Sequence, residues 1–248
     1  MYQFFVNANQ IEGTHIYIDG SDMNHIKNVL RMKIGEELNV VTDCDDKEYR
    51  CEIESFDEDR VNLTVQFIKE SNVELPNRVF LLQGLPKGDK LELIIQKSVE
   101  LGVFSIIPVS LKRSVVKLDA KKAKSKTERW QAISEAAAKQ SKRRIIPKIS
   151  EPKTLKEALE MCKDTEVKIV PYELCDFDTM SKTRELLSGI KPGEDIAILI
   201  GPEGGFDERE IEDAVNAGFD EITLGHRILR TETAPITLLS WLVYLLEQ

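Results

Sequence analysis

The sequence predicts a chain of two parts, a small β-barrel followed by an α/β domain with a mostly parallel sheet. In the first part, apolar residues between Val61 and Phe67 alternate with polar ones, the period of two typical of a half-buried strand. After residue 78, apolar strands alternate with helical stretches, which indicates a parallel sheet covered on both faces. A glycine turn at 201–205 follows a buried strand, where α/β proteins build ligand clefts.

The first part is expected to be rich in strands. They are predicted at residues 2–6, 14–18, 37–42, 47–56 and 60–68. One helix is expected over residues 21–30, capped by the hydroxyl of Ser21. Such strands close most readily into a small barrel, which leaves no open edges. The segment 71–77 has no periodicity and reads as a linker, so the predicted domains are residues 1–72 and 73–248.

In the second part the elements alternate in type. Strands are predicted at 78–83, 104–109, 167–171, 196–200 and 221–224. Helices are predicted at 90–101, 127–141, 155–161, 180–187, 208–217 and 235–247. The last helix is apolar on nearly every side, which favours both burial in the core and contact with another subunit.

Composition bounds the class of protein. The 248 residues are 42% hydrophobic and 31% charged, as in a soluble globular protein. No stretch reaches the roughly 18 apolar residues of a membrane helix, and the N-terminus lacks the pattern of a secretory signal. The cysteines are scattered, with no CxxC pair and no adjacent histidine. We therefore expect a cytoplasmic protein with reduced thiols and no metal.

The net charge of −9 is unevenly distributed along the chain. From Lys112 to Lys148 there are thirteen Lys and Arg against three Asp and Glu, a local excess of ten positive charges. The rest of the chain then has an excess of nineteen negative charges. Such separation fits either a basic footprint for RNA or a solvated helical surface.

Several common chemistries find no support in the motifs. The three histidines have no serine or cysteine partner at a nucleophile turn, and the turn at 201–205 is neither GxGxxG nor a Walker loop. What remains is a polar, glycine-lined cleft beside a basic segment, which suits a small polar cofactor and an RNA substrate. Its polar residues are Glu203, Arg227, Arg230, Thr231, Glu232 and Thr233. Its glycines allow backbone to approach a ligand closely, although most such turns bind nothing.

Longer motifs resemble one family. They are the stretches 200–206 (IGPEGGF), 224–234 (LGHRILRTETA), 25–33 (HIKNVLRMK), 97–103 (KSVELGV), 113–116 (RSVV), 128–130 (ERW), 135–141 (EAAAKQS) and 144–147 (RIIP). Together they are similar to the RsmE family, the SPOUT-class methyltransferases that act on N3 of a uridine in 16S ribosomal RNA of the small ribosomal subunit. The resemblance covers essentially the whole chain.

The resemblance implies a PUA-like barrel for RNA contact, then a SPOUT domain with a C-terminal trefoil knot. It further implies S-adenosylmethionine as cofactor, a homodimer, and the 30S subunit or its RNA as partner. The implied cofactor contacts are Tyr172, Glu173, Ile200, Gly201, Pro202, Glu203, Gly204, Gly205, Leu224, Gly225, Ile228, Leu229, Arg230, Thr233 and Ala234. The expected RNA contacts are Arg31, Arg113, Lys139, Arg143 and Arg144. Gln3 stands where the family often has a basic residue.

The chemistry implied by this resemblance requires that the N3 proton of uridine leave before or during methyl transfer. Arg230 is the expected cation for the uridine anion, and Glu232 or Glu203 is the expected base. Thr233 can alternatively serve only as a helix cap. Two other readings stay open: a SPOUT methyltransferase acting on a ribose hydroxyl of tRNA, and a non-catalytic RNA-binding factor in ribosome assembly.

Overall fold

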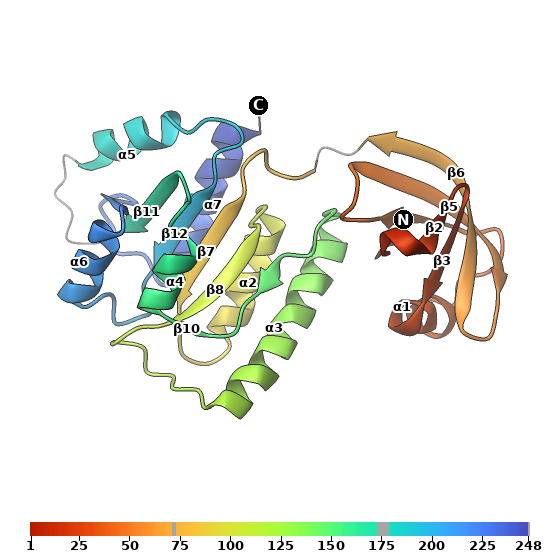
Figure 1. Cartoon of the computed structure of the whole chain (residues 1–248), viewed down its shortest axis with the longest axis horizontal. Helices are drawn as coiled ribbons and strands as arrows, with labels where there is room; N and C mark the ends of the chain where they lie inside the picture. Colours follow the sequence, from red (N-terminus) through yellow and green to blue (C-terminus); the bar gives the residue numbers. More distant parts are fainter. Residues whose placement is uncertain (71–72, 173–178, 248) are drawn as a thin grey trace. The chain divides into compact units, whose positions relative to one another are not determined.

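The computed structural model describes residues 1–70, 73–172 and 179–247 and divides into two compact units (Figure 1). Unit 1 comprises Met1–Glu74 and Lys139–Ile145, and unit 2 comprises Leu75–Ala138 and Ile146–Gln248. The chain therefore re-enters unit 1 through Lys139–Ile145, here called the returning segment. Nothing in the sequence indicated this return. The domain boundary expected between residues 72 and 73 stays a prediction.

Unit 1 is built on a six-stranded sheet in the order β1-β4-β5-β6-β3-β2. Its strands are β1 (Gln3–Phe5), β2 (Ile11–Glu12), β3 (His15–Asp19), β4 (Glu37–Val41), β5 (Lys47–Phe56) and β6 (Arg60–Glu70). The β1–β4 pair is parallel and the other pairs are antiparallel. Between β5 and β6 the register shifts at Arg50/Cys51 and again at Ile53/Ser55. Because such irregularities bend a strand, the sheet can curl around one apolar core.

The short helices of unit 1 are η1 (Ala8–Gln10), α1 (Gly20–Asn24) and the π-helix η2 (His25–Val29). The expectation that Ser21 caps a helix is wrong, because the helix begins at Gly20 and its N-cap residue is Asp19. Ile26 is fully buried and joins the core of the sheet. Arg31 follows the helix in the left-handed region (φ 53°), where a helical path cannot continue.

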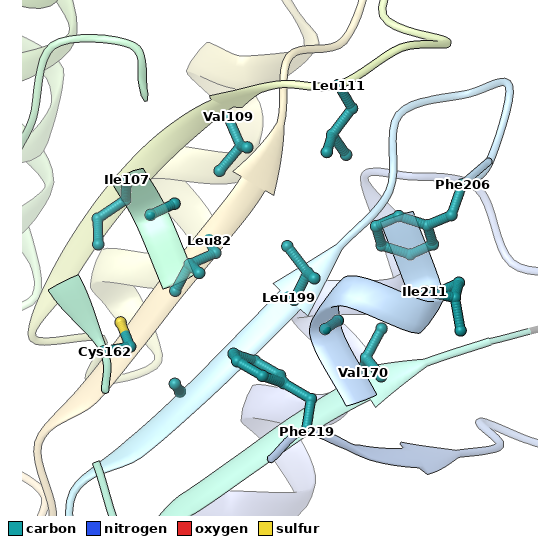
Figure 2. Close-up of a cluster of buried hydrophobic side chains, with 13 residues drawn as sticks. Leu82, Ile107, Val109, Leu111, Cys162, Val170, Leu199, Phe206, Ile211 and Phe219 are labelled. Carbon is teal, nitrogen blue, oxygen red and sulfur yellow. The ribbon is translucent and has the colours of Figure 1, made fainter. Parts of the chain in front are cut away.

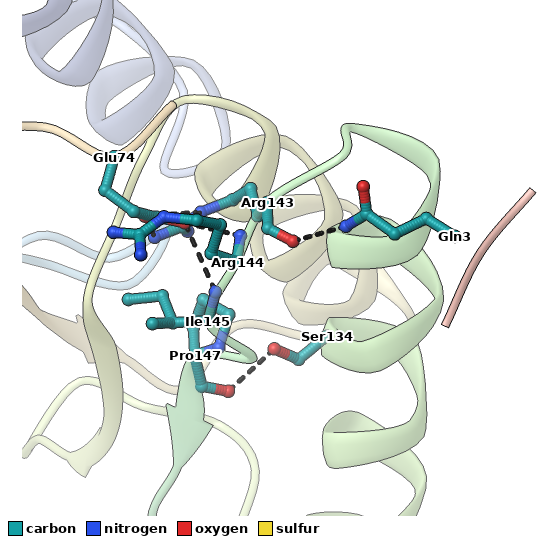
Figure 3. A network of polar contacts seen from close by, with 7 residues as sticks. All are labelled: Gln3, Glu74, Ser134, Arg143, Arg144, Ile145 and Pro147. Carbon is teal, nitrogen blue, oxygen red and sulfur yellow. Dashed lines mark hydrogen bonds and ion pairs between the residues drawn. The ribbon is translucent and has the colours of Figure 1, made fainter. Parts of the chain in front are cut away.

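Glu74 fastens the returning segment to the rest of unit 1 (Figure 3). Its carboxylate accepts hydrogen bonds from Nε of Arg143 (3.1 Å) and from the backbone N–H groups of Arg144 (2.8 Å) and Ile145 (3.2 Å). Gln3 completes the network by donating from Nε2 to the carbonyl oxygen of Arg143 (2.7 Å). The Arg143 side chain is only 4% exposed, so the pair is stable because hydrogen bonds satisfy both charges.

Unit 2 contains a seven-stranded sheet in the order β10-β8-β7-β12-β11-β13, with β9 paired to β8. Its strands are β7 (Val79–Gly84), β8 (Ser105–Ser110), β9 (Lys148–Ile149), β10 (Lys153–Thr154), β11 (Val167–Pro171), β12 (Ile196–Ile200) and β13 (Asp220–Ile222). Every pair is parallel, which confirms the predicted α/β fold. The predicted knot stays a prediction, because strand order does not establish how the loops are threaded.

Helices cover both faces of this sheet. They are α2 (Lys90–Glu100), α3 (Ala120–Gln140), α4 (Leu155–Met161), α5 (Thr179–Ser188), α6 (Glu208–Asn216) and α7 (Thr233–Leu246). Helices α2 and α7 pack together behind the sheet, while α4 and α6 lie in front (Figure 1). The adjacent residues Leu81 and Leu82 point to opposite faces, and both are fully buried. No helix in the described ranges is long and apolar enough to span a membrane.

The front face holds a continuous apolar core (Figure 2). Strand residues such as Leu82, Val109 and Leu199 meet Ile211 of α6 and Ala158 of α4 there. The core extends to Phe206, directly after the glycine turn, and so anchors that turn to the sheet. Helix α3 begins well before the predicted residue 127, since its first turns are lysine- and alanine-rich and show no apolar stripe to predict from.

The Glu74 network can be tested by stability. Glu74→Gln should lower the free energy of unfolding of unit 1 by about 3 kcal/mol, because the guanidinium of Arg143 is left buried without a countercharge. Denaturant titration followed by fluorescence or circular dichroism measures this loss. Glu70→Gln, on an exposed carboxylate of β6, is the matched control and should change it by about 0.5 kcal/mol or less. Equal effects of the two variants would contradict the assignment.

Candidate functional site

A cavity of about 670 Å³ opens in unit 2 beside the ends of β11, β12 and β13. One wall is the glycine turn 201–205 after β12, and another is the loop 223–231 after β13. These strands are neighbours in the order β12-β11-β13, so their carboxyl ends meet at one edge of the sheet. Size and position are those of a small-molecule site in an α/β protein.

Most of the predicted cofactor contacts line this cavity. They are Tyr172, Ile200, Gly201, Pro202, Glu203, Gly205, Leu224, Gly225, Ile228, Leu229, Arg230 and Ala234. Gly204 and Thr233 are not in its lining, and Glu173 lies outside the described residues. Thr233 is the first residue of α7, whose N-cap residue is Glu232. The structure thus brings two loops together as expected, while the ligand contacts themselves stay predictions.

Other lining residues were not among the expected cofactor contacts, although Arg227 and Thr231 were expected as polar residues of the cleft. They are Lys90, Pro171, Met180, Phe206, Thr223, His226, Arg227 and Thr231. His226 lies inside the loop that the motif identified, and Phe206 ends the other motif, so adjacency alone could have found both. Lys90 begins α2, and only the pairing of β7 with β12 brings it near the glycine turn.

The turn glycines are required mainly by the protein's own backbone and packing. A Cβ at Gly201 would come within 3.1 Å of the Phe206 ring, and one at Gly204 within 3.1 Å of Cβ of Arg113. Gly225 has a φ of 108°, which residues with a side chain rarely adopt. At Gly201 and Gly204, therefore, the missing side chain leaves room for neighbouring residues rather than for a ligand.

Glu203 is held at the cavity by two donors, one from the first residue of α2 and one from the loop just before it. Its carboxylate lies 2.9 Å from Nζ of Lys90 and accepts from the backbone N–H of Lys87 (3.1 Å). Partial burial raises the pKa of Glu203. The hydrogen bonds from Lys90 and from backbone N–H groups outweigh that effect, so the pKa lies below its usual value. Such an anchored carboxylate is a weak proton acceptor.

Glu232 differs from Glu203 in its free acceptor capacity. Its Oε2 lies 3.5 Å from Nζ of Lys90, so the two glutamates share one cation. That oxygen is buried, and it has no hydrogen-bond partner among the described residues. The Lys90 ammonium is close enough for an ion pair but too distant for a good hydrogen bond, so this oxygen can still accept one. Glu232 itself is not in the lining of the cavity.

Arg230 supplies positive charge at the cavity wall. Its carbonyl oxygen accepts from the N–H groups of Thr233 (2.8 Å) and Ala234 (3.0 Å), so the start of α7 fixes its backbone. Its side chain is exposed, and no ion pair of its guanidinium is found within the described ranges. The cation is therefore available to a bound molecule.

The expected RNA contacts have unequal surroundings. In unit 1, Arg143 is buried against Glu74, Lys139 pairs with Asp22 (2.7 Å) and Arg144 pairs with Asp46 (2.6 Å). The burial of Arg143 argues against a direct contact between its guanidinium and a phosphate.

Arg31 and Arg113 are exposed and so remain candidates for phosphate contact. Arg113, in unit 2, donates from Nη1 to the carbonyl oxygen of Gly204 (3.1 Å), which ties it to the glycine turn. No group of three or more His, Cys, Asp or Glu within the described ranges could hold a metal ion.

The shared cation predicts a pH-dependent loss of stability in Lys90→Met. Because Lys90 depresses the pKa of Glu203, its stabilising effect is full above the usual carboxyl pKa and disappears as pH falls through the depressed value. Unfolding of wild type and variant, compared from pH 7 to pH 3, should show a difference that shrinks toward acid. Lys97→Met, which breaks a half-buried pair with Glu100 on the same helix, is the control. A difference independent of pH would contradict the arrangement.

Two family models match separate parts of the chain. A family model described as an RNA methyltransferase domain matches residues 73–243, and one described as an RNA methyltransferase PUA domain matches residues 18–66. The chain is 39% identical to the ribosomal RNA small subunit methyltransferase E of Bacillus subtilis, an alignment that covers 100% of this chain and 98% of that protein.

Solved structures show the same fold over the full length. The ribosomal RNA small subunit methyltransferase E of Neisseria gonorrhoeae, bound to S-adenosylmethionine, superposes with a TM-score of 0.83 at 30% identity, covering 99% of this chain and 98% of that one. A methyltransferase of Legionella pneumophila in complex with the same cofactor gives a TM-score of 0.82 at 32% identity, covering 98% and 97%.

Proposed function

Because the chain belongs to the ribosomal RNA small subunit methyltransferase E family, we propose that it methylates N3 of a uridine in 16S ribosomal RNA, using S-adenosylmethionine. The observation that carries the proposal is the cavity between the glycine turn 201–205 and the loop 223–231, in a fold shared with relatives solved with that cofactor. A ribosomal RNA substrate also implies work in the cytoplasm.

The lining of the cavity fits this cofactor. Leu224, Ile228 and Leu229 line it and offer apolar surface for a nucleoside. When bound, S-adenosylmethionine supplies an electrophilic methyl group on a positively charged sulfur. The protein must then chiefly orient the uridine and manage its proton.

We assign the proton chemistry to Arg230 and Glu232. Arg230 stabilises the negative charge that develops on the uracil ring, since its guanidinium is exposed at the cavity wall. Glu232 accepts the N3 proton, because its buried Oε2 has acceptor capacity to spare among the described residues. Glu203 instead holds the turn to the start of α2, through Lys90 and Lys87.

We assign RNA recognition to two surfaces, one on each unit. Unit 1 contains the PUA-family region, and it presents Arg31 as an exposed cation. In unit 2, Arg113 is exposed beside the glycine turn, and the first turns of α3 expose a run of lysines. Phosphate contacts from such residues fix the position of RNA without reading its sequence.

We further propose that the protein works as a homodimer through α7. Pro235, Leu238, Leu239 and Leu242 are buried, yet Tyr244 on the same helix is 79% exposed. Ile228 of the cavity loop is 84% exposed. Large apolar groups exposed on this helix and loop are typical of a surface that another subunit covers.

The proposed function predicts the loss of one methyl group from ribosomal RNA. Cells that lack the protein should contain 16S RNA with an unmodified uridine, and expression of the wild type should restore the mass increment of one methyl. Arg230→Ala should restore about one hundredth as much per unit time or less, because it lacks the stabilising cation. Arg184→Ala, an exposed residue of α5, should behave as wild type. Mass mapping of RNA fragments measures this, and a restored methyl with Arg230→Ala would exclude Arg230 from the mechanism.

The RNA surface predicts a salt effect at Arg113. Arg113→Gln removes one charge but keeps the stem that packs on Gly204, so RNA affinity should fall and the slope of log affinity against log salt should become shallower by about one. Filter binding or fluorescence anisotropy over a salt series measures the slope. Lys156→Gln, exposed on α4, should leave it unchanged. An identical slope in the Arg113 variant would exclude a phosphate contact there.

A further inference from the structure

We propose that Gln83 is a positioning residue that fixes the loop 223–231 and the turn 201–205, the two walls of the cofactor cavity, relative to each other. It is not part of the cavity lining, and it carries no charge. The inference rests on the proposed function, because the ligand whose affinity Gln83 controls is S-adenosylmethionine.

Gln83 reaches the cavity from behind. It lies near the end of β7, whose register places it opposite Ile200, the last residue of β12. Gly201, the first residue of the turn, follows directly. The side chain is fully buried. Any effect of Gln83 on a ligand must therefore pass through the residues that it contacts.

Hydrogen bonds link Gln83 to both loops. The Gln83 amide donates from Nε2 to Oγ1 of Thr231 (3.0 Å) and to the carbonyl oxygen of Gly84 (3.0 Å). The Thr231 hydroxyl donates in turn to the carbonyl oxygen of Gly201 (2.7 Å). Since a hydroxyl has one proton, Thr231 must accept from the amide, which determines the orientation of the Gln83 amide. The chain amide–hydroxyl–carbonyl joins β7, the loop 223–231 and the turn 201–205.

The joined atoms lie next to the residues that a ligand would touch. Thr231 follows Arg230, the proposed cation, and itself lines the cavity. Gly201 and Pro202 line the opposite wall. Close packing limits relaxation here, because a Cβ at Gly84 would come within 2.8 Å of the backbone nitrogen of Pro202. A change in the hydrogen bonds must therefore shift the loop of Arg230 relative to the turn.

The amide is present at an energetic cost. Oε1 of Gln83 is buried and has no hydrogen-bond partner within the described ranges, and such an atom is destabilising. Its neighbours in the strand, Leu81 and Leu82, are apolar and equally buried. A residue that served packing alone would be apolar here too, so the donor to Thr231 is the property that distinguishes Gln83.

The test compares affinity with stability. Gln83→Met preserves length and removes the donor, and Thr231→Val removes the hydroxyl; each should raise the Kd for S-adenosylmethionine about tenfold, equivalent to about 1.4 kcal/mol. The double variant should bind no more weakly than the weaker single variant, because both remove the same chain of hydrogen bonds. Thr231→Ser restores the hydroxyl and should recover most of the affinity. Isothermal titration of the full-length protein with S-adenosylmethionine gives each Kd.

A matched control separates positioning from general damage to the core. Leu81→Met alters a fully buried residue of the same strand, and it should leave the Kd within about twofold of wild type. Thermal unfolding of all variants shows their stability. The inference is overturned if Gln83→Met binds as wild type does, if Leu81→Met weakens binding equally, or if the Gln83 and Thr231 effects add. A wild type that binds no S-adenosylmethionine would overturn the proposed function together with this inference.

Discussion

The arrangement of the site depends on β12, a strand buried along its whole length between β7 and β11. All five of its residues, from Ile196 to Ile200, are at most 3% exposed. Such a strand has no freedom to shift, because its side chains pack on both faces and its backbone is paired on both edges. The glycine turn that follows it therefore emerges at a fixed point. Phe206 then returns the chain to the same core and fixes the other end of the turn.

Next to that fixed turn, Lys90 interacts unequally with Glu203 and Glu232. Lys90 lies closer to Glu203 than to Glu232, and the backbone N–H of Lys87 adds a second donor only to Glu203. The carboxylate of Glu203 consequently has its hydrogen-bond donors in place and a lowered pKa. Glu232 retains an oxygen that can accept a hydrogen bond. Two carboxylates beside the same lysine thus differ in chemistry because their other neighbours differ, although the residue type is the same.

The strongest predictions from sequence were those with a local cause. The bounds of β11, β12 and α4 match the predicted ranges, since each is a short apolar or periodic stretch bounded by turn or capping residues. Strands β9 and β10 are too short to carry a period, and the π-helical turn η2 follows no simple pattern. The loops of the cavity were accessible through their motifs. Lys90 and Gln83 were not, because only the placement of β7 beside β12 brings them to the turn.

The basic segment shows why charge counting and charge placement are separate problems. A count of the charges between Lys112 and Lys148 gives every residue the same weight. In the fold, Arg143 forms a buried ion pair with Glu74. Arg144 pairs with Asp46, and Lys139 pairs with Asp22. A charge that is buried and paired contributes little to the field outside the protein, and little to the release of ions from RNA. Exposed residues such as Arg113, whose guanidinium donates to the carbonyl oxygen of Gly204, are the better candidates for the proposed phosphate contacts. An RNA phosphate bound to Arg113 would lie next to the glycine turn, which also forms one wall of the cofactor cavity. The same short piece of backbone would then contact the cofactor and hold the residue that binds the substrate.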